Sequence, residues 1–269
     1  MIIKPKKGWQ LIDIKELCNY KELFYFLVAK EIKIRYKQTV LGGLWAVIQP
    51  FLSMVIFTLF LGKFAKMPSD GVPYPIFNFS ALIAWNYFAS TVTRSGSSLI
   101  GNVKLISRVY FPRLIIPLAP SVAGLMDFFI AFLVLIGLMF YFHIYPTVMI
   151  LYLPLLVLLI ILSASGVGLF LASLSIKYRD IPTITPFLLQ LWMFASPIVY
   201  PTSMIPAEYR LIYALNPMAG ILEGFRSALL KTVPFPWHMI LISAITSIIL
   251  FIFGLIYFQQ VERFFADII

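Results

Sequence analysis

Three charged residues in this chain stand where their chemistry would matter most. Asp127 is the only acidic residue well inside a long apolar run, and Glu223 and Arg226 lie three residues apart in a shorter one. A carboxylate in such a run either takes part in transport or joins helices through hydrogen bonds, and both interpretations stay open for Asp127. Glu223 and Arg226 have the spacing at which opposite charges meet on one face of a helix, so we expect them to pair.

The other residues that commonly act as catalysts or ligands are isolated from one another. His143 and His238 have no carboxylate or cysteine nearby, and Cys18 is the only cysteine, so the sequence predicts neither a metal site nor an intramolecular disulfide. The sequence signatures of zinc peptidases and serine hydrolases are absent. The only Gly-Lys pair, Gly62-Lys63, lacks the glycine that a phosphate-cradling loop needs. We therefore expect a chain that is not an enzyme and that holds no cofactor itself.

Composition indicates the solvent in which these residues must work. Hydrophobic residues make up 61% of the 269 positions and charged residues only 12%, whereas soluble domains carry about 25% charged residues. One core of this size could not bury so much apolar surface, so lipid must cover part of it. The net charge is +10, but the basic residues do not form a stripe interleaved with aromatic residues, and we expect no nucleic-acid partner.

Six apolar runs are long enough to cross about 30 Å of hydrocarbon as helices. They cover residues 41–61, 76–93, 114–142, 148–174, 181–200 and 239–258. The second run is the weakest because it contains Asn78, Ser80 and Asn86. Pro117 and Pro120 give the third run a reason to tilt or kink. The sequence thus predicts an all-α integral membrane protein with six transmembrane helices.

The basic residues predict the orientation of these spans. Under a six-span alternation, 16 of the 21 basic residues fall on one side, in segments 1–40, 94–113, 175–180 and 259–269. Cytoplasmic loops accumulate Lys and Arg, so we expect both termini in the cytoplasm. The chain then divides into a cytoplasmic N-terminal segment (1–40), a six-span domain (41–258) and a short cytoplasmic tail (259–269).

The first 40 residues predict an amphipathic helix on the membrane surface. Lys30, Lys33 and Lys37 would share one helical face, with Leu27 and Val28 on another. Such a helix could bind anionic lipid or dock a partner subunit, and the two roles are compatible. The first apolar run follows this charged stretch and is about as long as a membrane span, so we expect no cleaved signal peptide.

Residues 201–236 combine five prolines with a short apolar run. The run, 218–230, has 13 residues and is too short to cross the membrane, which favours a re-entrant or interfacial helix between the fifth and sixth spans. Irregular backbone at that depth must be enclosed by protein or must line a water-filled cavity. We therefore expect this segment to border a pathway at the outer face, with Glu223 and Arg226 as an outer gate whose polarity can be reversed.

The segment 102–113 is short, basic and on the expected cytoplasmic side. Asn102 is a suitable N-cap for a helix over 103–111, which the next proline would end. Lys104 and Arg108 are four residues apart and would share one face of that helix. A short amphipathic helix under the membrane suits docking of a soluble partner better than a plain solvated loop would.

Short motifs in a fixed order then give the chain a resemblance to a known family. The motifs are RYKQTVLG (35–42), LW (44–45), QP (49–50), GVPYP (71–75), AWNYF (84–88), VYFPR (109–113), YRD (178–180), SPIVYP (196–201), LNPM (215–218) and Glu223-Gly224-Phe225-Arg226. Through them the chain resembles the permease subunits of polysaccharide-export ABC transporters, which export O-antigen, capsule or teichoic acid. The motifs extend over most of the chain, from about residue 30 to residue 230.

The resemblance implies an architecture and partners. It implies a homodimeric channel in the bacterial inner membrane, driven by two copies of a cytoplasmic ATPase subunit that binds ATP and Mg²⁺. The cargo would be a polyisoprenyl-linked polysaccharide, with O-antigen the expected one, and membrane lipid would surround the channel. The two inner loops of the family map onto Lys104, Arg108, Tyr110, Phe111 and Arg113, and onto Tyr178, Arg179 and Asp180, as contacts for the ATPase.

Aromatic residues on the first and fifth runs are candidates for the translocation pathway, because these runs line the channel in the family. They are Trp45, Phe51, Trp192, Phe194 and Tyr200. Aromatic rings can stack on the apolar faces of sugar rings, but aromatic residues also face lipid in any membrane protein, and both roles stay open. Two alternatives for the whole chain are an ABC permease for another lipid or drug, and a membrane-embedded glycan polymerase or ligase.

Overall fold

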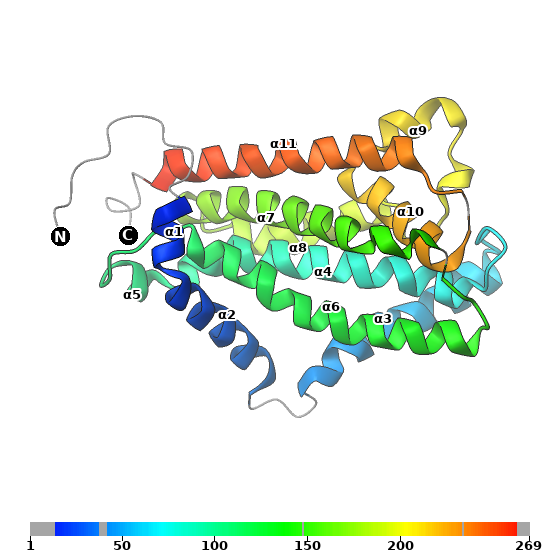
Figure 1. The fold of residues 1–269 in the computed structure, drawn as a ribbon, viewed down its shortest axis with the longest axis horizontal. Coiled ribbons are helices and arrows are strands. Elements are labelled where there is room, and N and C mark those ends of the chain that lie inside the picture. The colour runs from blue at the N-terminus through cyan, green and yellow to red at the C-terminus, as the bar shows by residue number, and fades with distance from the viewer. Residues whose placement is uncertain (1–13, 38–41, 147, 233, 263–269) are drawn as a thin grey trace.

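The described part of the chain is helical throughout. The computed structural model describes residues 14–37, 42–146, 148–232 and 234–262, and within these ranges it contains helices and turns but no strand. Figure 1 shows the long helices side by side in an elongated bundle. The all-α class is confirmed. Parts of the expected N-terminal segment (1–13) and tail (263–269) lie outside the described residues.

The helices follow one another with short connections. They are α1 (Ile14–Asn19), α2 (Lys21–Tyr36), α3 (Trp45–Phe57), α4 (Tyr74–Gly101), α5 (Val103–Ile106), α6 (Ile115–Tyr141), α7 (Leu153–Lys177), α8 (Ile181–Phe194), α9 (Ala207–Tyr213), α10 (Pro217–Leu230) and α11 (Trp237–Glu262). A 3₁₀ turn precedes each of α3, α7 and α9, and a π-helical segment, Thr58–Phe64, continues α3.

Four helical stretches are both long and apolar enough to cross a membrane. They are Gly42–Phe64, Ile115–Tyr141, Val148–Lys177 and Trp237–Glu262. They coincide with the first, third, fourth and sixth predicted runs to within a few residues at each end. The chain is therefore a multi-pass membrane protein with four candidate spans among its described residues.

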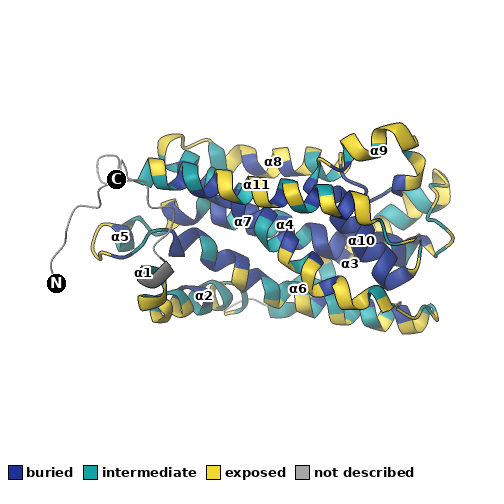
Figure 2. Ribbon diagram, turned by 45° about the horizontal axis from the view of Figure 1, so that its top comes forward, coloured by how far each residue is buried: buried dark blue, intermediate teal, exposed yellow. Residues whose placement is uncertain are grey.

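The second predicted run lies in α4, which is the central helix of the bundle. α4 has 28 residues and packs against α3, α6, α7, α8 and α10. Most of its residues are buried, including the polar Asn78 and Ser80, and Figure 2 shows α4 dark blue between more exposed helices. A helix surrounded by protein does not need an apolar surface for lipid, which explains its weak hydropathy.

The fifth predicted run is wrong beyond residue 194. α8 has 14 residues, which rise about 21 Å at 1.5 Å per residue. Residues 195–200 instead form turns in which Ser196 and Ile198 are fully buried. Pro197 accounts for the early end, because a proline disfavours helical backbone in the residue before it and cannot donate a helical hydrogen bond.

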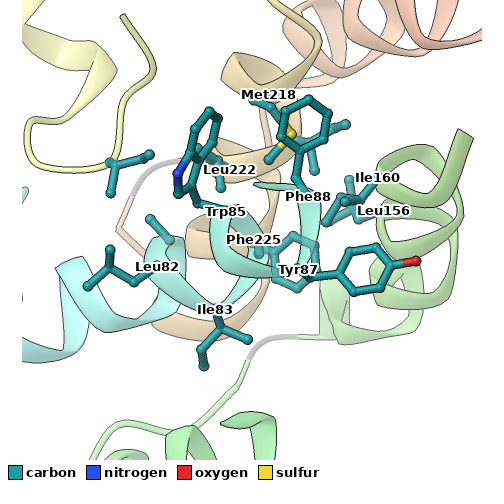
Figure 3. Packing of buried hydrophobic residues seen from close by; sticks show 14 of the residues in the cluster. Leu82, Ile83, Trp85, Tyr87, Phe88, Leu156, Ile160, Met218, Leu222 and Phe225 are labelled. Carbon is teal, nitrogen blue, oxygen red and sulfur yellow. The ribbon is translucent and has the colours of Figure 1, made fainter. Parts of the chain in front are cut away.

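The core is built around the middle of α4. Figure 3 shows Trp85 and Phe88 of α4 close to Leu156 of α7 and to Leu222 and Phe225 of α10. A second apolar cluster lies at the end of the bundle that holds α1 and α5, where α2 packs against α6. The side of α2 that was predicted to be apolar therefore faces protein.

Small residues allow α7 and α11 to approach closely. A Cβ atom added at Gly254 would lie 2.1 Å from the carbonyl oxygen of Gly166. Nearby, Ser163 and Ser247 join the same two helices by a 2.7 Å hydrogen bond between their hydroxyl groups. Close backbone approach and hydroxyl hydrogen bonds are the usual means of joining helices where lipid removes the hydrophobic drive between them.

Candidate functional site

The two ends of the bundle differ in chemistry. We call the end with α1, α2, segment 102–114 and turn 178–180 the basic end, and the end with segment 195–236 the proline-rich end (Figure 1). Both loops predicted to contact an ATPase fall at the basic end, because α4 and α7 both finish there. The short helix predicted over 218–230 falls at the other end, as α10.

The predicted amphipathic helix over 103–111 is wrong, because α5 has only four residues. The side chain of Asn102 does not cap it. Its amide nitrogen donates to the carbonyl oxygen of Ser98 at 2.8 Å, and its Oδ1 accepts from Lys30 Nζ at 2.7 Å. The side chain thus completes the end of α4 and joins it to α2, and it makes no capping hydrogen bond to α5.

The residues of this first loop separate into exposed and buried sets. Lys104 and Arg108 are exposed, and 66% of Tyr110 is accessible. Phe111 is buried, with 4% accessible, in the cluster that includes Leu27 of α2. Lys104, Arg108 and Tyr110 are therefore available to a partner, whereas Phe111 fastens the loop to α2.

Arg113 connects the same loop to the last helix. Its backbone nitrogen donates to Oε1 of Glu262 at 3.3 Å, and its Nη1 donates to the carbonyl oxygen of Glu262 at 3.1 Å. At the second loop, Tyr178, Arg179 and Asp180 are all exposed at the start of α8. The basic end thus offers two exposed patches, one of which is tied to α2 and α11.

A cavity of about 760 Å³ lies between α2 and α3 on one side and α4, α6 and α8 on the other. The amide and hydroxyl side chains that line it are Gln49, Ser53, Asn86, Ser90, Thr93 and Gln190. The aromatic side chains that line it are Tyr36, Trp45, Phe57, Trp85, Tyr87 and Phe128. The composition is that of a site for a polar ligand with apolar faces.

Of the five aromatic residues predicted for a pathway, only Trp45 lines this cavity. Phe51 and Phe194 are exposed on α3 and α8. Trp192 donates its ring N–H to Oδ1 of Asn216 at 3.0 Å, and the hydroxyl of Tyr200 lies 2.9 Å from that of Tyr213. The last two residues thus organise the proline-rich end.

Asp127 also lines the cavity, together with Arg35 and Arg94, which sequence reasoning did not single out as site residues. Arg35 on α2 and Asp127 on α6 form an ion pair, and the hydroxyl of Tyr36 donates to the same carboxylate. Arg94 on α4 lines the cavity next to them. Burial raises the pKa of Tyr36, and the hydrogen bond and negative charge of Asp127 raise it further. These contacts favour the helix-joining interpretation of Asp127. No sequence signal could have matched it to residues 92 positions away.

The predicted pair of Glu223 and Arg226 forms inside the proline-rich end. Their side chains are 1% and 0% exposed, and Arg226 Nη1 lies 3.7 Å from Glu223 Oε2. Arg226 also donates to the carbonyl oxygens of Phe77 at 3.3 Å, Ile198 at 2.6 Å and Tyr200 at 3.5 Å. Its guanidinium lies 3.6 Å from the centre of the Phe77 ring. Arg226 thus joins α10 to α4 and to the turn after α8.

Comparison with known proteins places these features in a wider group. The family described as ABC-2 type transporter matches residues 22–230. An O-antigen export system permease protein of Myxococcus xanthus is 28% identical over 259 residues, 95% of this chain and 98% of the relative. One from Klebsiella pneumoniae is 29% identical over 264 residues, 96% of this chain and 100% of the relative. A polysialic acid transport protein of Escherichia coli is 28% identical over 212 residues, 76% of this chain and 80% of the relative.

Proposed function

This chain belongs to the ABC-2 type transporter family, and on that premise we propose that it is the membrane permease of an ATP-driven polysaccharide exporter. The observation that carries the proposal is the cavity between α2–α3 and α4, α6 and α8. Its amide and hydroxyl groups can exchange hydrogen bonds with sugar hydroxyls, and the exposed ring of Trp45 can stack on the apolar faces of sugar rings. Neither feature would serve a purely apolar drug.

We propose lipid-linked O-antigen as the cargo. Two of the relatives described above are named for O-antigen export and a third for polysialic acid transport. The first two relatives match this chain over nearly their full length, and the third matches it over four-fifths of its length. The cargo class of these relatives is therefore the best guide to the cargo of this chain. The lipid carrier would be a polyisoprenyl diphosphate.

The membrane topology that fits this function has six spans. α4 is long enough for a span, and α8 would cross with the help of the buried turn 195–200. α10 would be the re-entrant helix at the outer face, enclosed by α4, α7 and α11 as irregular membrane segments require. The basic end would face the cytoplasm and the chain would lie in the bacterial inner membrane.

The partners would meet the chain on two surfaces. Two copies of an ATPase subunit, which would bind ATP and Mg²⁺, would dock at Lys104, Arg108 and Tyr110 and at the exposed turn 178–180. A second copy of this chain would meet the exposed apolar side chains of α3 and α8 and complete the channel. Phe51 and Phe194 would then face the pathway or the other copy.

Deletion of the gene in its host tests the proposal. Without the chain, polysaccharide should disappear from the cell surface while lipid-linked polymer accumulates inside the cell, and a plasmid copy should reverse both effects. Immunoblots of whole cells and of extracted lipid-linked glycan measure the two pools. Normal surface polysaccharide in the deletion strain would refute polysaccharide export. Loss of both pools together would instead indicate a polymerase.

A further inference from the structure

One corner of the cavity contains more hydrogen-bond donors than the described chain satisfies. We call Arg35 and Arg94, which both line the cavity, the arginine corner. The side chain of Arg35 is only 4% exposed. Its Nη1 is engaged by Asp127, but among the described residues its buried Nε and Nη2 have no hydrogen-bond acceptor. A buried guanidinium with two unused donors is costly unless a ligand supplies acceptors.

The positive charge of Arg94 has a distant carboxylate partner, Glu31. Its Nη1 lies 3.9 Å from Oε2 of Glu31, a distance too long for a hydrogen bond. Its side chain is 40% exposed and therefore accessible from the cavity. The positive charges of Arg35 and Arg94 are close enough to repel each other. A negative charge between them would relieve this repulsion.

Asp127 brings one negative charge to this corner, shared between the two arginines, and both of its oxygens already accept a hydrogen bond. Oδ2 accepts from Arg35 and Oδ1 accepts from Tyr36. Among the described residues, what remains in the corner is the pair of unused donors on Arg35, Nε and Nη2, beside the partly exposed guanidinium of Arg94. The fork of a guanidinium matches the oxygens of a phosphate group, and two arginines can hold the adjacent phosphates of a diphosphate.

We infer that the arginine corner binds the diphosphate that links the polyisoprenyl carrier to the first sugar of the cargo, an assignment that rests on the proposed function. The nearby Gln49, Asn86 and Trp45 then meet the first sugars. The site recognises the chemical group shared by polymers that are linked to a polyisoprenyl diphosphate, whatever their sugar sequence. Anionic phospholipid headgroups contain the same phosphate chemistry and are the competing source.

Calorimetric titration of the purified full chain in neutral phosphatidylcholine nanodiscs tests the site. The probes are farnesyl diphosphate, farnesol and short-chain phosphatidylglycerol. Farnesyl diphosphate should bind at least about tenfold more tightly than farnesol, because charged hydrogen bonds contribute most of the affinity. It should also bind more tightly than phosphatidylglycerol, which presents one phosphate to two arginines.

Two variants locate the binding to the corner. Arg35→Lys keeps a cation against Asp127 but removes the unused Nε and Nη2 donors, and it should weaken farnesyl diphosphate binding about tenfold. Arg94→Gln, at a partly exposed side chain, should weaken it by a similar factor without a risk to folding. Arg210→Lys is the matched control, because Arg210 lies on α9 outside the cavity, and it should bind like the wild type.

Equal affinity for farnesyl diphosphate and farnesol, or wild-type affinity in both Arg35→Lys and Arg94→Gln, would overturn the inference. Phosphatidylglycerol that binds as tightly as the diphosphate and depends on the same arginines would also overturn it, in favour of a lipid-headgroup site. The export assay separates this failure from failure of the proposed function. If the wild-type gene restores surface polysaccharide and Arg94→Gln restores it equally fast, the diphosphate site alone is refuted.

Discussion

The guanidinium of Arg226 holds three separate stretches of chain together. The spacing of Glu223 and Arg226 predicts their pairing, because residues three apart share a helical face. The spacing does not predict the contacts to Phe77, Ile198 and Tyr200, since those carbonyl groups are brought in by the tertiary fold. The ion pair of Arg35 and Asp127, 92 residues apart, was beyond sequence reasoning for the same cause.

These carbonyl contacts change what a charge reversal should do. In the exchange variant Glu223→Arg plus Arg226→Glu, a carboxylate at position 226 would face carbonyl oxygens and the π-face of Phe77. The exchange should therefore fail to restore stability, contrary to the reversible pair expected from spacing alone. We expect a loss of about 3–5 kcal/mol, similar to that of Arg226→Gln.

The unfolding temperature of the detergent-purified chain measures the effect of the exchange. Arg108→Gln, at an exposed position, serves as the control and should unfold like the wild type. An exchange variant with a wild-type unfolding temperature and normal export would show that only the presence of two opposite charges matters.

At the scale of helices, the apolar runs of the sequence predicted the positions of the long helices. The sequence did not predict where two of the expected helices end. Runs 114–142 and 148–174 were predicted well because lipid-facing helices must be apolar along their whole length. The ends of the helices predicted over 181–200 and 103–111 depend on single residues instead. Pro197 stops α8, and the side chain of Asn102 forms hydrogen bonds to α4 and α2 and does not cap the next helix. Such dependence on single side chains leaves no periodic signal.

The exposed part of the loop after α4 should transmit the motion of an ATPase. Lys104→Glu plus Arg108→Glu should abolish export and reduce co-purification of the ATPase, because both side chains are solvent-exposed and their charge is reversed. The unfolding temperature should stay within a degree or two of the wild type, since exposed substitutions cost little. Lys63→Glu, an exposed lysine outside the basic end, is the control. Unchanged export and co-purification in the double variant would show that the loop is not a docking element.

The contact between α7 and α11 should tolerate no added side chain at its closest point. Gly254→Val would place a Cβ atom 2.1 Å from the carbonyl oxygen of Gly166, so the helices must separate. We expect a loss of at least about 1–3 kcal/mol, the usual range for overpacking, and less folded chain in membranes. Gly137→Val is the matched control, because a Cβ atom there meets nothing within 4 Å. Equal loss in both variants would indicate a general effect of β-branched residues on membrane helices.

For the whole molecule, the asymmetry between the basic end and the proline-rich end is the main clue to orientation. The counts of basic residues predicted the asymmetry, and among the described residues segment 102–114 and turn 178–180 lie at one end of the bundle (Figure 1). An orientation with this end in the cytoplasm also puts the residues proposed to dock the ATPase where ATP is available.

Cysteine labelling measures this orientation. After replacement of Cys18, which is exposed, a cysteine at Tyr110 should react with an impermeant maleimide only in permeabilised cells. A cysteine at the exposed Ser203 should react in intact spheroplasts. Position 110 is chosen because Tyr110 is exposed, whereas Ile106 in the same loop is buried. Labelling of position 110 from outside would contradict the six-span topology.

The anchoring of the first loop also determines how mechanical work would pass through the bundle. The loop is fixed to α2 by Phe111, to α11 by the contacts of Arg113 with Glu262, and at its start by the bond from Lys30 to Asn102. A segment fastened at three points is stiff, so a push on Tyr110 is not absorbed by bending of the loop. The displacement would then pass to the ends of α2, α4 and α11 together, and a small stroke at one surface would tilt several helices at once.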